Sequence, residues 1–273
     1  MIKEMMMKDI LVQVDGSERA RLRIDIAAGL ARRFGARLTG LFAQTDSQRA
    51  AATARVASDA LKAAAAEAEA QFTQAAREVE SRWWSLPHGE PGFVAAEVMF
   101  CARFFDLVVL GQNDPKDPTT PDDMVEETIL NCGRPVLVLP ALGTYASVGT
   151  RAVVAWNASR EATRAVHDSL PLLTGAGTVT VISMRAHDDS ATAAAMPPVN
   201  LPNHLARLGV PVSSEFLPDE EIGKMDMLLS RSFDLGADLL VMGAHGQYGL
   251  SRLRGSGTRH ILKHMTLPVL MSH

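Results

Sequence analysis

The chain has 273 residues, of which 47% are hydrophobic and 21% are charged, and its formal net charge is −4. This balance is that of a globular protein, and the charge gives no support to a general nucleic-acid or anionic-membrane surface. No apolar run approaches the roughly 18 residues that span a bilayer, the start lacks the apolar core of a signal peptide, and two cysteines offer no disulfide framework. We therefore expect a cytoplasmic protein without a membrane span.

The sequence contains two copies of one pattern, which suits a length of two domains of about 130–140 residues. In each copy a short apolar run enters a polar turn, at Asp15-Gly-Ser in the first and at Asn157-Ala-Ser in the second. Near the ends of the copies Gly111 matches Gly243, at a smaller offset than the one that relates Asp15 to Asn157, because the middle of the second copy is shorter. We expect domains over residues 1–146 and 147–273.

Hydrophobic periodicity and turn residues predict alternating strands and helices in both copies. Ser17 and Ser159 are expected to cap the first helix of each copy. The predicted strands cover residues 10–14, 37–42, 83–86, 107–110 and 135–139, then 152–156, 178–183, 212–216, 239–242 and 268–271. Beyond the two capped helices, the predicted helices cover residues 50–79, 92–104 and 124–130, then 203–208, 221–235 and 258–265.

Strands that alternate with helices imply βαβ units, and therefore parallel sheets with helices on both faces. Ligands bind such sheets beyond the carboxyl ends of the strands, where the strand order changes direction. Asn157 and Gly243 both stand at predicted strand ends, so we expect them to meet at one crevice.

A glycine-rich segment lies between a buried strand and a helix in the second copy. Glycines let the backbone approach a ligand, and the free amides at a helix start can hold phosphate. The spacing matches neither the dinucleotide fingerprint nor the P-loop, so a plain connecting loop is the alternative interpretation. The segment contains Gly243, Gly246, Gly255, Ser256 and Gly257.

These residues resemble the nucleotide loop of the universal stress protein family: Gly243-x-x-Gly246, an interval, Gly255-Ser256, and then Pro268-Val-Leu-Met. The Val-Asp-Gly-Ser opening and the Asp-Leu-Val-Val-Leu-Gly strand are similar to that family too, so the resemblance covers nearly the whole chain twice. It implies two tandem doubly wound α/β domains, each with a five-stranded parallel sheet flanked by helices.

The resemblance also implies an ATP pocket in the second domain, with Mg²⁺ as a candidate companion of the triphosphate. Asn157 would lie near the adenine and ribose, and Gly246, Gly255 and Ser256 would hold phosphates. The pocket would comprise Ala155, Asn157, Met184, Met242, Gly243, His245, Gly246, Gly255, Ser256 and Gly257.

The sequence departs from the family pattern in both copies. The interval before Gly255 has eight residues instead of nine, and Asn157 replaces the usual aspartate. In the first copy Asp114 stands where the second loop glycine belongs and a proline-rich acidic segment follows, so we expect no nucleotide there. Arg252, Arg254 and Arg259 fit either charge neutralisation of a triphosphate or an ordinary solvated basic face.

Two hypotheses follow. The first, which the resemblance implies, is a regulatory or protective stress protein that binds an adenine nucleotide and hydrolyses it slowly at most. The sequence offers no general base and no paired carboxylates beside the loop, so no catalytic residue is assigned. The second, favoured by the short interval and by Asn157, is an interaction scaffold or a binder of another small ligand. The resemblance further implies that the two halves pack as an intramolecular pseudo-dimer, with association of two chains left open.

Overall fold

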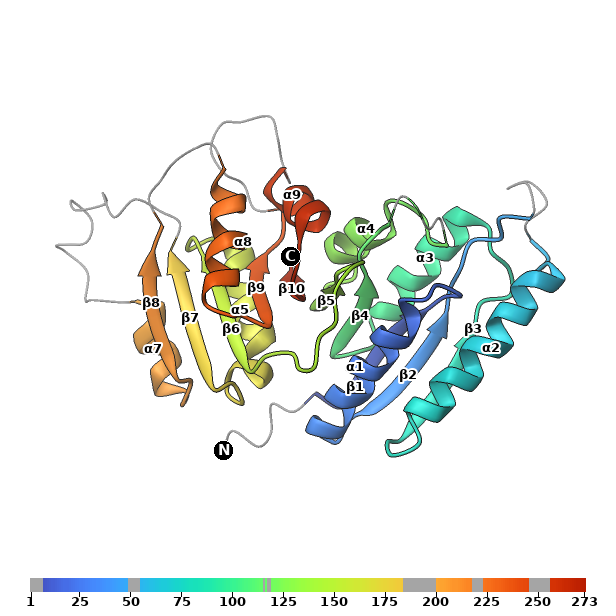
Figure 1. Ribbon diagram of the computed structural model, residues 1–273, viewed down its shortest axis with the longest axis horizontal. Helices are drawn as coiled ribbons and strands as arrows, with labels where there is room; N and C mark the ends of the chain where they lie inside the picture. The colour runs from blue at the N-terminus through green and yellow to red at the C-terminus, as the bar shows by residue number, and fades with distance from the viewer. Residues whose placement is uncertain are drawn as a thin grey trace. The chain divides into compact units, whose positions relative to one another are not determined.

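The computed structural model describes residues 7–48, 55–114, 116, 119–183, 200–217, 223–245 and 256–273. The chain divides into two compact units, unit 1 over residues 1–146 and unit 2 over residues 147–273. Each unit alternates strands and helices along the chain (Figure 1).

Unit 1 contains β1 (Asp9–Val14), α1 (Ala20–Phe34), β2 (Arg37–Phe42), α2 (Asp59–Ala75), β3 (Ser81–Ser85), α3 (Pro91–Ala102), β4 (Leu107–Gly111), α4 (Met124–Asn131) and β5 (Val136–Leu139). Unit 2 contains β6 (Arg151–Trp156), α5 (Arg160–Leu173), β7 (Thr178–Ser183), α7 (Leu201–Arg207), β8 (Val212–Phe216), α8 (Lys224–Asp234), β9 (Leu239–Gly243), α9 (Ser256–His264) and β10 (Val269–Ser272).

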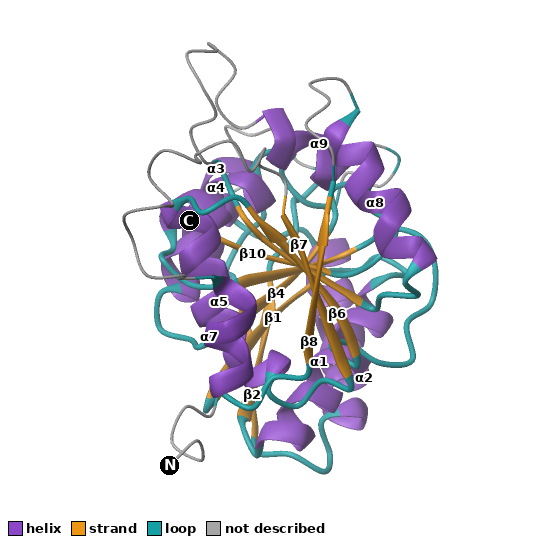
Figure 2. Ribbon diagram, turned by 90° about the vertical axis from the view of Figure 1, so that its left-hand side faces the viewer, coloured by secondary structure: helices purple, strands orange, loops and turns teal. Residues whose placement is uncertain are grey.

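The strands of each unit are parallel and follow the same order. Unit 1 has the order β3-β2-β1-β4-β5, and unit 2 has the order β8-β7-β6-β9-β10. Helices lie on both faces of the strands (Figure 2). The predicted fold class, tandem doubly wound α/β, is confirmed. The strand order changes direction between β1 and β4 and between β6 and β9, so the carboxyl ends of those strands are where a ligand site is expected.

The two units can be compared residue by residue through their strand registers. Ile10 pairs with Leu107 in unit 1, and the equivalent pair in unit 2 is Ala152 with Leu239. This register reproduces both offsets seen in the sequence, the opening one from Asp15 to Asn157 and the later one from Gly111 to Gly243. The buried faces of α1 and α5 match at the opening offset as well. These two offsets relate residues of unit 1 to their counterparts in unit 2.

A carboxylate anchors the entry of the first strand in each unit. Asp106 accepts backbone hydrogen bonds from Lys8 and Asp9 at 2.7 and 3.0 Å. Its counterpart Asp238 accepts from the Ser147 hydroxyl and from three backbone amides, at 2.8 to 3.1 Å. Because a carboxylate accepts several bonds at once, one side chain fixes the start of β6 and the residues before it.

Two local predictions need correction. Ser17 does not cap α1, which begins at Ala20 without a side-chain cap, because the Ser17 hydroxyl bonds to Asp15 instead. Residues 50–54 of the helix predicted over 50–79 lie outside the described residues. Within the rest, α2 begins after Ser58, whose side chain accepts from the amide of Leu61 at 3.1 Å, and it ends at Ala75. The high helix propensity of alanine extends the prediction past the real cap.

Candidate functional site

The loop after β6 is held in place by two local hydrogen bonds. The Asn157 side-chain oxygen accepts from the Ser159 amide at 3.0 Å, and the Ser159 hydroxyl accepts from the Ala162 amide at 3.1 Å. The second bond is the predicted N-cap of α5, which is confirmed. Asn157 is thereby fixed at the carboxyl end of β6.

Gly243 lets the start of α5 pack directly against the end of β9. A Cβ atom at this position would lie 2.4 Å from the Ala162 nitrogen and 2.5 Å from the Glu161 carbonyl carbon. Since β6 and β9 are neighbouring parallel strands, the loop that carries Asn157 and the end of β9 lie at one edge of the sheet. This is the edge at which the sequence predicts a ligand site.

The residues after β9 are tied to the first turn of α9. The His245 amide donates to the Thr258 hydroxyl at 2.8 Å, and the His273 ring pairs with the Ala244 carbonyl at 3.0 Å. His245 has φ 55° and Ala158 has φ 57°, and they are the two non-glycine residues with positive φ in the described part of the chain. Such backbone strain concentrates at ligand sites, and both residues lie at this edge of unit 2.

The described residues of the predicted pocket come from three elements. Ala155 and Met242 are buried in β6 and β9, and Ser256 and Gly257 form the first turn of α9. Asn157, Gly243 and His245 lie at the strand ends. Met184, Gly246 and Gly255, together with Arg252 and Arg254, lie outside the described residues.

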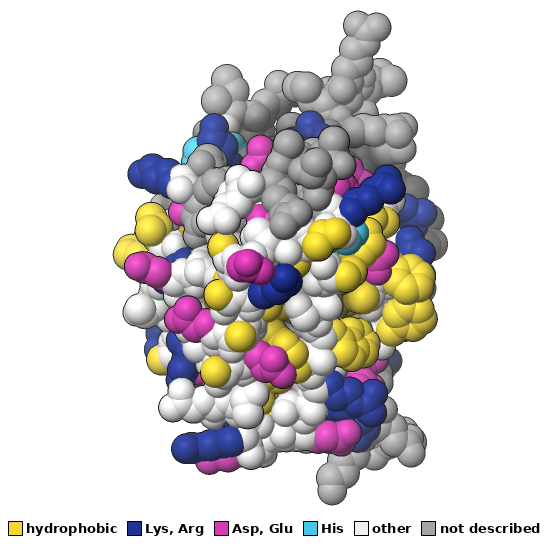
Figure 3. Space-filling model, turned by 90° about the vertical axis from the view of Figure 1, so that its right-hand side faces the viewer, with side chains coloured by type: hydrophobic (Ala, Val, Ile, Leu, Met, Phe, Trp, Pro, Cys, Tyr) yellow, Lys and Arg dark blue, Asp and Glu magenta, His cyan; other side chains and the backbone are white. Residues whose placement is uncertain are grey.

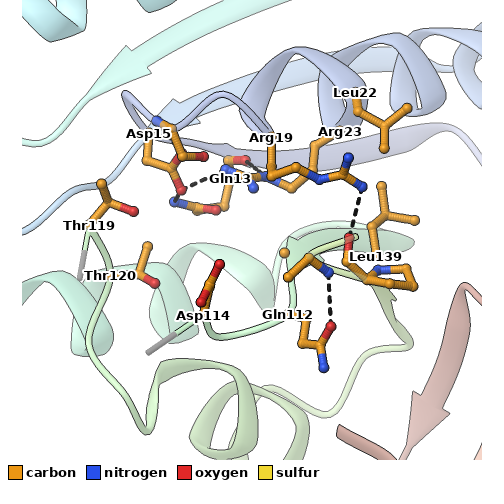
Figure 4. Close-up of a pocket in the computed structure, with 14 residues that line it drawn as sticks. Gln13, Asp15, Arg19, Leu22, Arg23, Gln112, Asp114, Thr119, Thr120 and Leu139 are labelled. Atoms are coloured by element: carbon orange, nitrogen blue, oxygen red, sulfur yellow. Dashed lines mark hydrogen bonds and ion pairs between the residues drawn. The ribbon is translucent and has the colours of Figure 1, made fainter. Parts of the chain in front are cut away.

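The matching edge of unit 1 forms a pocket that is lined by both polar and apolar side chains (Figure 4). At its base the Asp15 carboxylate accepts from the Arg23 guanidinium at 2.6 Å, from the Gln13 amide at 3.1 Å, and from the backbone and hydroxyl of Ser17. The side chains of Asp15 and Arg23 are only 4% and 5% exposed. Burial by itself would raise the pKa of Asp15, but the Arg23 charge and the bonds from Ser17, Arg23 and Gln13 leave that pKa below its ordinary value.

Further contacts within unit 1 cover the same edge. The Gln44 side chain accepts from the Gly16 amide at 2.6 Å, and the Thr45 amide donates to the Thr119 carbonyl at 2.8 Å. The Arg19 guanidinium donates to the Pro140 carbonyl at 3.0 Å. The Gly16 amide, the Thr119 carbonyl and one guanidinium nitrogen of Arg19 are therefore engaged by the chain itself.

Counterparts at the base of the site differ in size and charge. Gln13, Asp15 and Arg23 of unit 1 correspond to Ala155, Asn157 and Ala165 of unit 2. Ala165 is fully buried on α5, as Arg23 is buried on α1. Where unit 1 places a buried ion pair, unit 2 places two methyl groups and a neutral amide.

Arg23 was not among the residues predicted from the sequence to form a site. Its signal is an arginine on the otherwise apolar buried face of α1, shortly after Asp15 in the chain, where the second copy has alanine. A charged residue on a buried helix face requires a partner, and Asp15 is the nearest acidic residue before it that follows a buried strand.

Membrane-spanning helices and metal clusters are both absent from the residues that the structure describes. Within that part of the chain, no helix is long and apolar enough to cross a membrane. No group of three or more His, Cys, Asp or Glu side chains in the same described ranges is arranged to hold a metal ion. The face shown in Figure 3 mixes basic and acidic side chains rather than gathering the basic ones into a stripe.

The family model of the universal stress protein family matches residues 6–113 and 224–273. The chain belongs to the universal stress protein family. The matched segments include β1, α1 and β4 of unit 1 and the β9 and α9 edge of unit 2, which are elements of the two compared sites.

Solved structures of this fold cover nearly the whole chain. A universal stress protein from Archaeoglobus fulgidus DSM 4304 has a TM-score of 0.68 and 13% identity, with 97% of each chain covered. A functionally unknown protein from Pseudomonas aeruginosa PAO1 has a TM-score of 0.58 and 19% identity, covering 97% of this chain and 92% of its own. At these identities the likeness shows the fold.

A universal stress protein from Archaeoglobus fulgidus has been solved in complex with dAMP. It covers 49% of this chain and 98% of its own, with 21% identity and a TM-score of 0.35. No curated protein matches the sequence.

Proposed function

We propose that unit 2 binds an adenine nucleotide, ATP in particular, at the carboxyl edge of β6 and β9, and that the protein has a regulatory or protective role in a stress response. The base and ribose lie beside Ala155, Asn157, Met184, Met242 and Gly243. The phosphates lie on the segment from His245 and Gly246 to Gly255, Ser256 and Gly257, with Mg²⁺ as a candidate companion.

The observation that carries this proposal is the contrast at the base of the two sites. Arg23 and Asp15 fill that place in unit 1, whereas Ala165 and Asn157 put smaller, uncharged side chains there in unit 2. The first turn of α9 supports the proposed position of the phosphates, because helix amides and the positive end of the helix dipole attract anions. The start of α9 is joined to the end of β9 through the His245–Thr258 bond.

The residues described at this edge include no carboxylate pair and no assigned general base, so the proposal assigns binding rather than turnover. Asn157 offers a carbonyl and an amide to a ligand in place of the family's aspartate. Hydrolysis is expected to be slow at most.

Calorimetry with ATP and with AMP tests the proposal on the full chain. We expect saturable binding of ATP with one site per chain. Gly246→Asp gives unit 2 the residue that unit 1 has at Asp114, and we expect this variant to lose binding while its thermal unfolding is unchanged. Absence of binding at millimolar nucleotide would refute the proposal, and normal binding by Gly246→Asp would refute the phosphate assignment.

The second candidate function is an interaction scaffold or a site for a different small ligand. Asn157 favours it, because a neutral amide lacks the charge and the purely accepting character of aspartate. Asn157→Asp separates the two functions. Stronger ATP binding by this variant supports a nucleotide site, whereas the absence of ATP binding in calorimetry for both the parent and the variant favours the scaffold.

A further inference from the structure

The pocket at the carboxyl edge of unit 1 has a buried side chain of the protein, Arg23, in its lining beside Asp15. We propose that the guanidinium group of Arg23 is a built-in occupant of the base of this pocket, where it takes the place beside Asp15 that a ligand would need. This inference concerns unit 1 alone and does not depend on nucleotide binding by unit 2.

The geometry of Arg23 is that of a ligand held from two sides. Its Nη2 donates to the Asp15 carboxylate at 2.6 Å, and its Nε donates to the Gln13 carbonyl at 3.2 Å (Figure 4). The end of β4 makes room for the group, because a Cβ atom on Gly111 would lie 2.6 Å from Nη1 of Arg23. Main chain from two neighbouring strands and one carboxylate therefore surround the guanidinium.

An external ligand could take this place only at a high electrostatic cost. Displacing Arg23 would leave the Asp15 carboxylate buried without its cation, and breaking a buried pair is far more costly than keeping it. Asp114 adds a second carboxylate to the lining of the pocket, which disfavours an anion further. Arg23 thus closes the pocket to nucleotides and keeps Asp15 neutralised.

Chemical rescue tests the proposal directly. In a full chain with Trp156→Phe, fluorescence comes from Trp83 and Trp84 of unit 1. Arg23→Ala should lower the midpoint of thermal unfolding by roughly 10 °C, and millimolar methylguanidinium should restore part of the loss. Methylammonium, which lacks the planar fork of donors, should restore less. The control Arg21→Ala, on the exposed face of α1, should respond to neither.

A second variant keeps the test valid when Arg23→Ala does not fold. Asp15→Asn combined with Arg23→Ala gives unit 1 the residues that unit 2 has at Asn157 and Ala165, and it removes the uncompensated buried charge. We expect the double variant to fold, and to unfold at a higher temperature than Arg23→Ala if that variant also folds. A double variant no more stable than Arg23→Ala overturns the proposal, and so does equal rescue by the two cations.

Discussion

Asp15 and Asn157 hold the same place in the two units, yet their surroundings give them different tasks. The Asp15 carboxylate is saturated by donors from its own unit and paired with a buried arginine. The Asn157 oxygen accepts from the backbone of Ser159. One residue completes an internal network, and the other is positioned at the edge of a proposed ligand site.

Acid should weaken unit 1 through Asp15. The pKa of Asp15 lies below its ordinary value in the folded state, so the stabilisation it provides is complete above roughly pH 5. That stabilisation is lost as the pH falls from the unfolded pKa through the lowered folded pKa, because the unfolded state takes up a proton more readily than the folded one. In urea titrations of unit 1, the free energy of unfolding should decline from about pH 7 to about pH 3, and Asp15→Asn should make this decline smaller.

Asp25→Asn is the control, because it removes a half-exposed carboxylate from α1. Its decline with acid should follow that of the parent. If Asp15→Asn and the parent lose stability in parallel, the Asp15 network does not govern the acid response of unit 1.

Asp238 is expected to matter for the stability of unit 2. Its carboxylate accepts four hydrogen bonds at the entry of β6, and Asp238→Asn replaces one of its accepting oxygens by a donor. We expect a loss of about 1–3 kcal/mol in the free energy of unfolding, measured by urea titration with Trp156 fluorescence in a chain with Trp83→Phe and Trp84→Phe. Asp234→Asn, an exposed position on α8, should change the value by less than about 0.5 kcal/mol.

At the scale of elements, the sequence predicts most of the strands and helices to within a few residues. Apolar runs bounded by turn residues identify β1 and β7, and helical spacing identifies the buried face of α1, including Ile24 and Phe34. Predictions of where helices begin and end are less accurate, as the wrongly predicted cap at Ser17 shows. Whether a serine caps a helix depends on what else its hydroxyl can reach, and that is settled by the folded loop around it.

The buried ion pair of the unit 1 site is harder to derive from sequence. Asp114 and the prolines after it suggest a loop unsuited to phosphate. The larger obstacle is Arg23, and its role appears only when α1 is placed against β1 and β4. A position-by-position comparison of the two copies indicates the role of Arg23, because Arg23 and Ala165 are related by the same offset as Asp15 and Asn157.

Transplanting the ion pair into unit 2 should close its site. Ala165→Arg with Asn157→Asp reproduces Arg23 and Asp15 at the base of the proposed pocket. We expect ATP affinity to fall at least about tenfold, or about 1.4 kcal/mol, because the guanidinium fills the space beside residue 157. Calorimetry on the double variant and on Asn157→Asp alone measures this. The single variant should bind at least as well as the parent.

Thr163→Arg is the matched control, since it adds the same side chain to the exposed face of α5. Its ATP affinity should equal that of the parent. Unchanged binding by the transplant would mean that the base of the β6–β9 edge is not where the nucleotide lies.

At the scale of the whole molecule, two units with one strand order differ in what their sites contain. Unit 1 has a buried ion pair in its pocket, and unit 2 has smaller side chains, strained backbone at Ala158 and His245, and a helix start beside the strand ends. A duplicated fold can keep one copy for binding and the other for support, because the stability of the second does not depend on a ligand.

This division predicts that ATP stabilises unit 2 alone. Trp156→Phe leaves fluorescence from unit 1, and Trp83→Phe with Trp84→Phe leaves it from Trp156 at the end of β6. At about 100 times its Kd, ATP adds roughly 2.7 kcal/mol to the fold that binds it. The Trp156 transition should therefore rise by roughly 5–10 °C, while the Trp83 and Trp84 transition stays within about 1 °C. Equal shifts of both transitions would contradict a site confined to unit 2, and a shift of the unit 1 transition alone would show that Arg23 does not close its pocket.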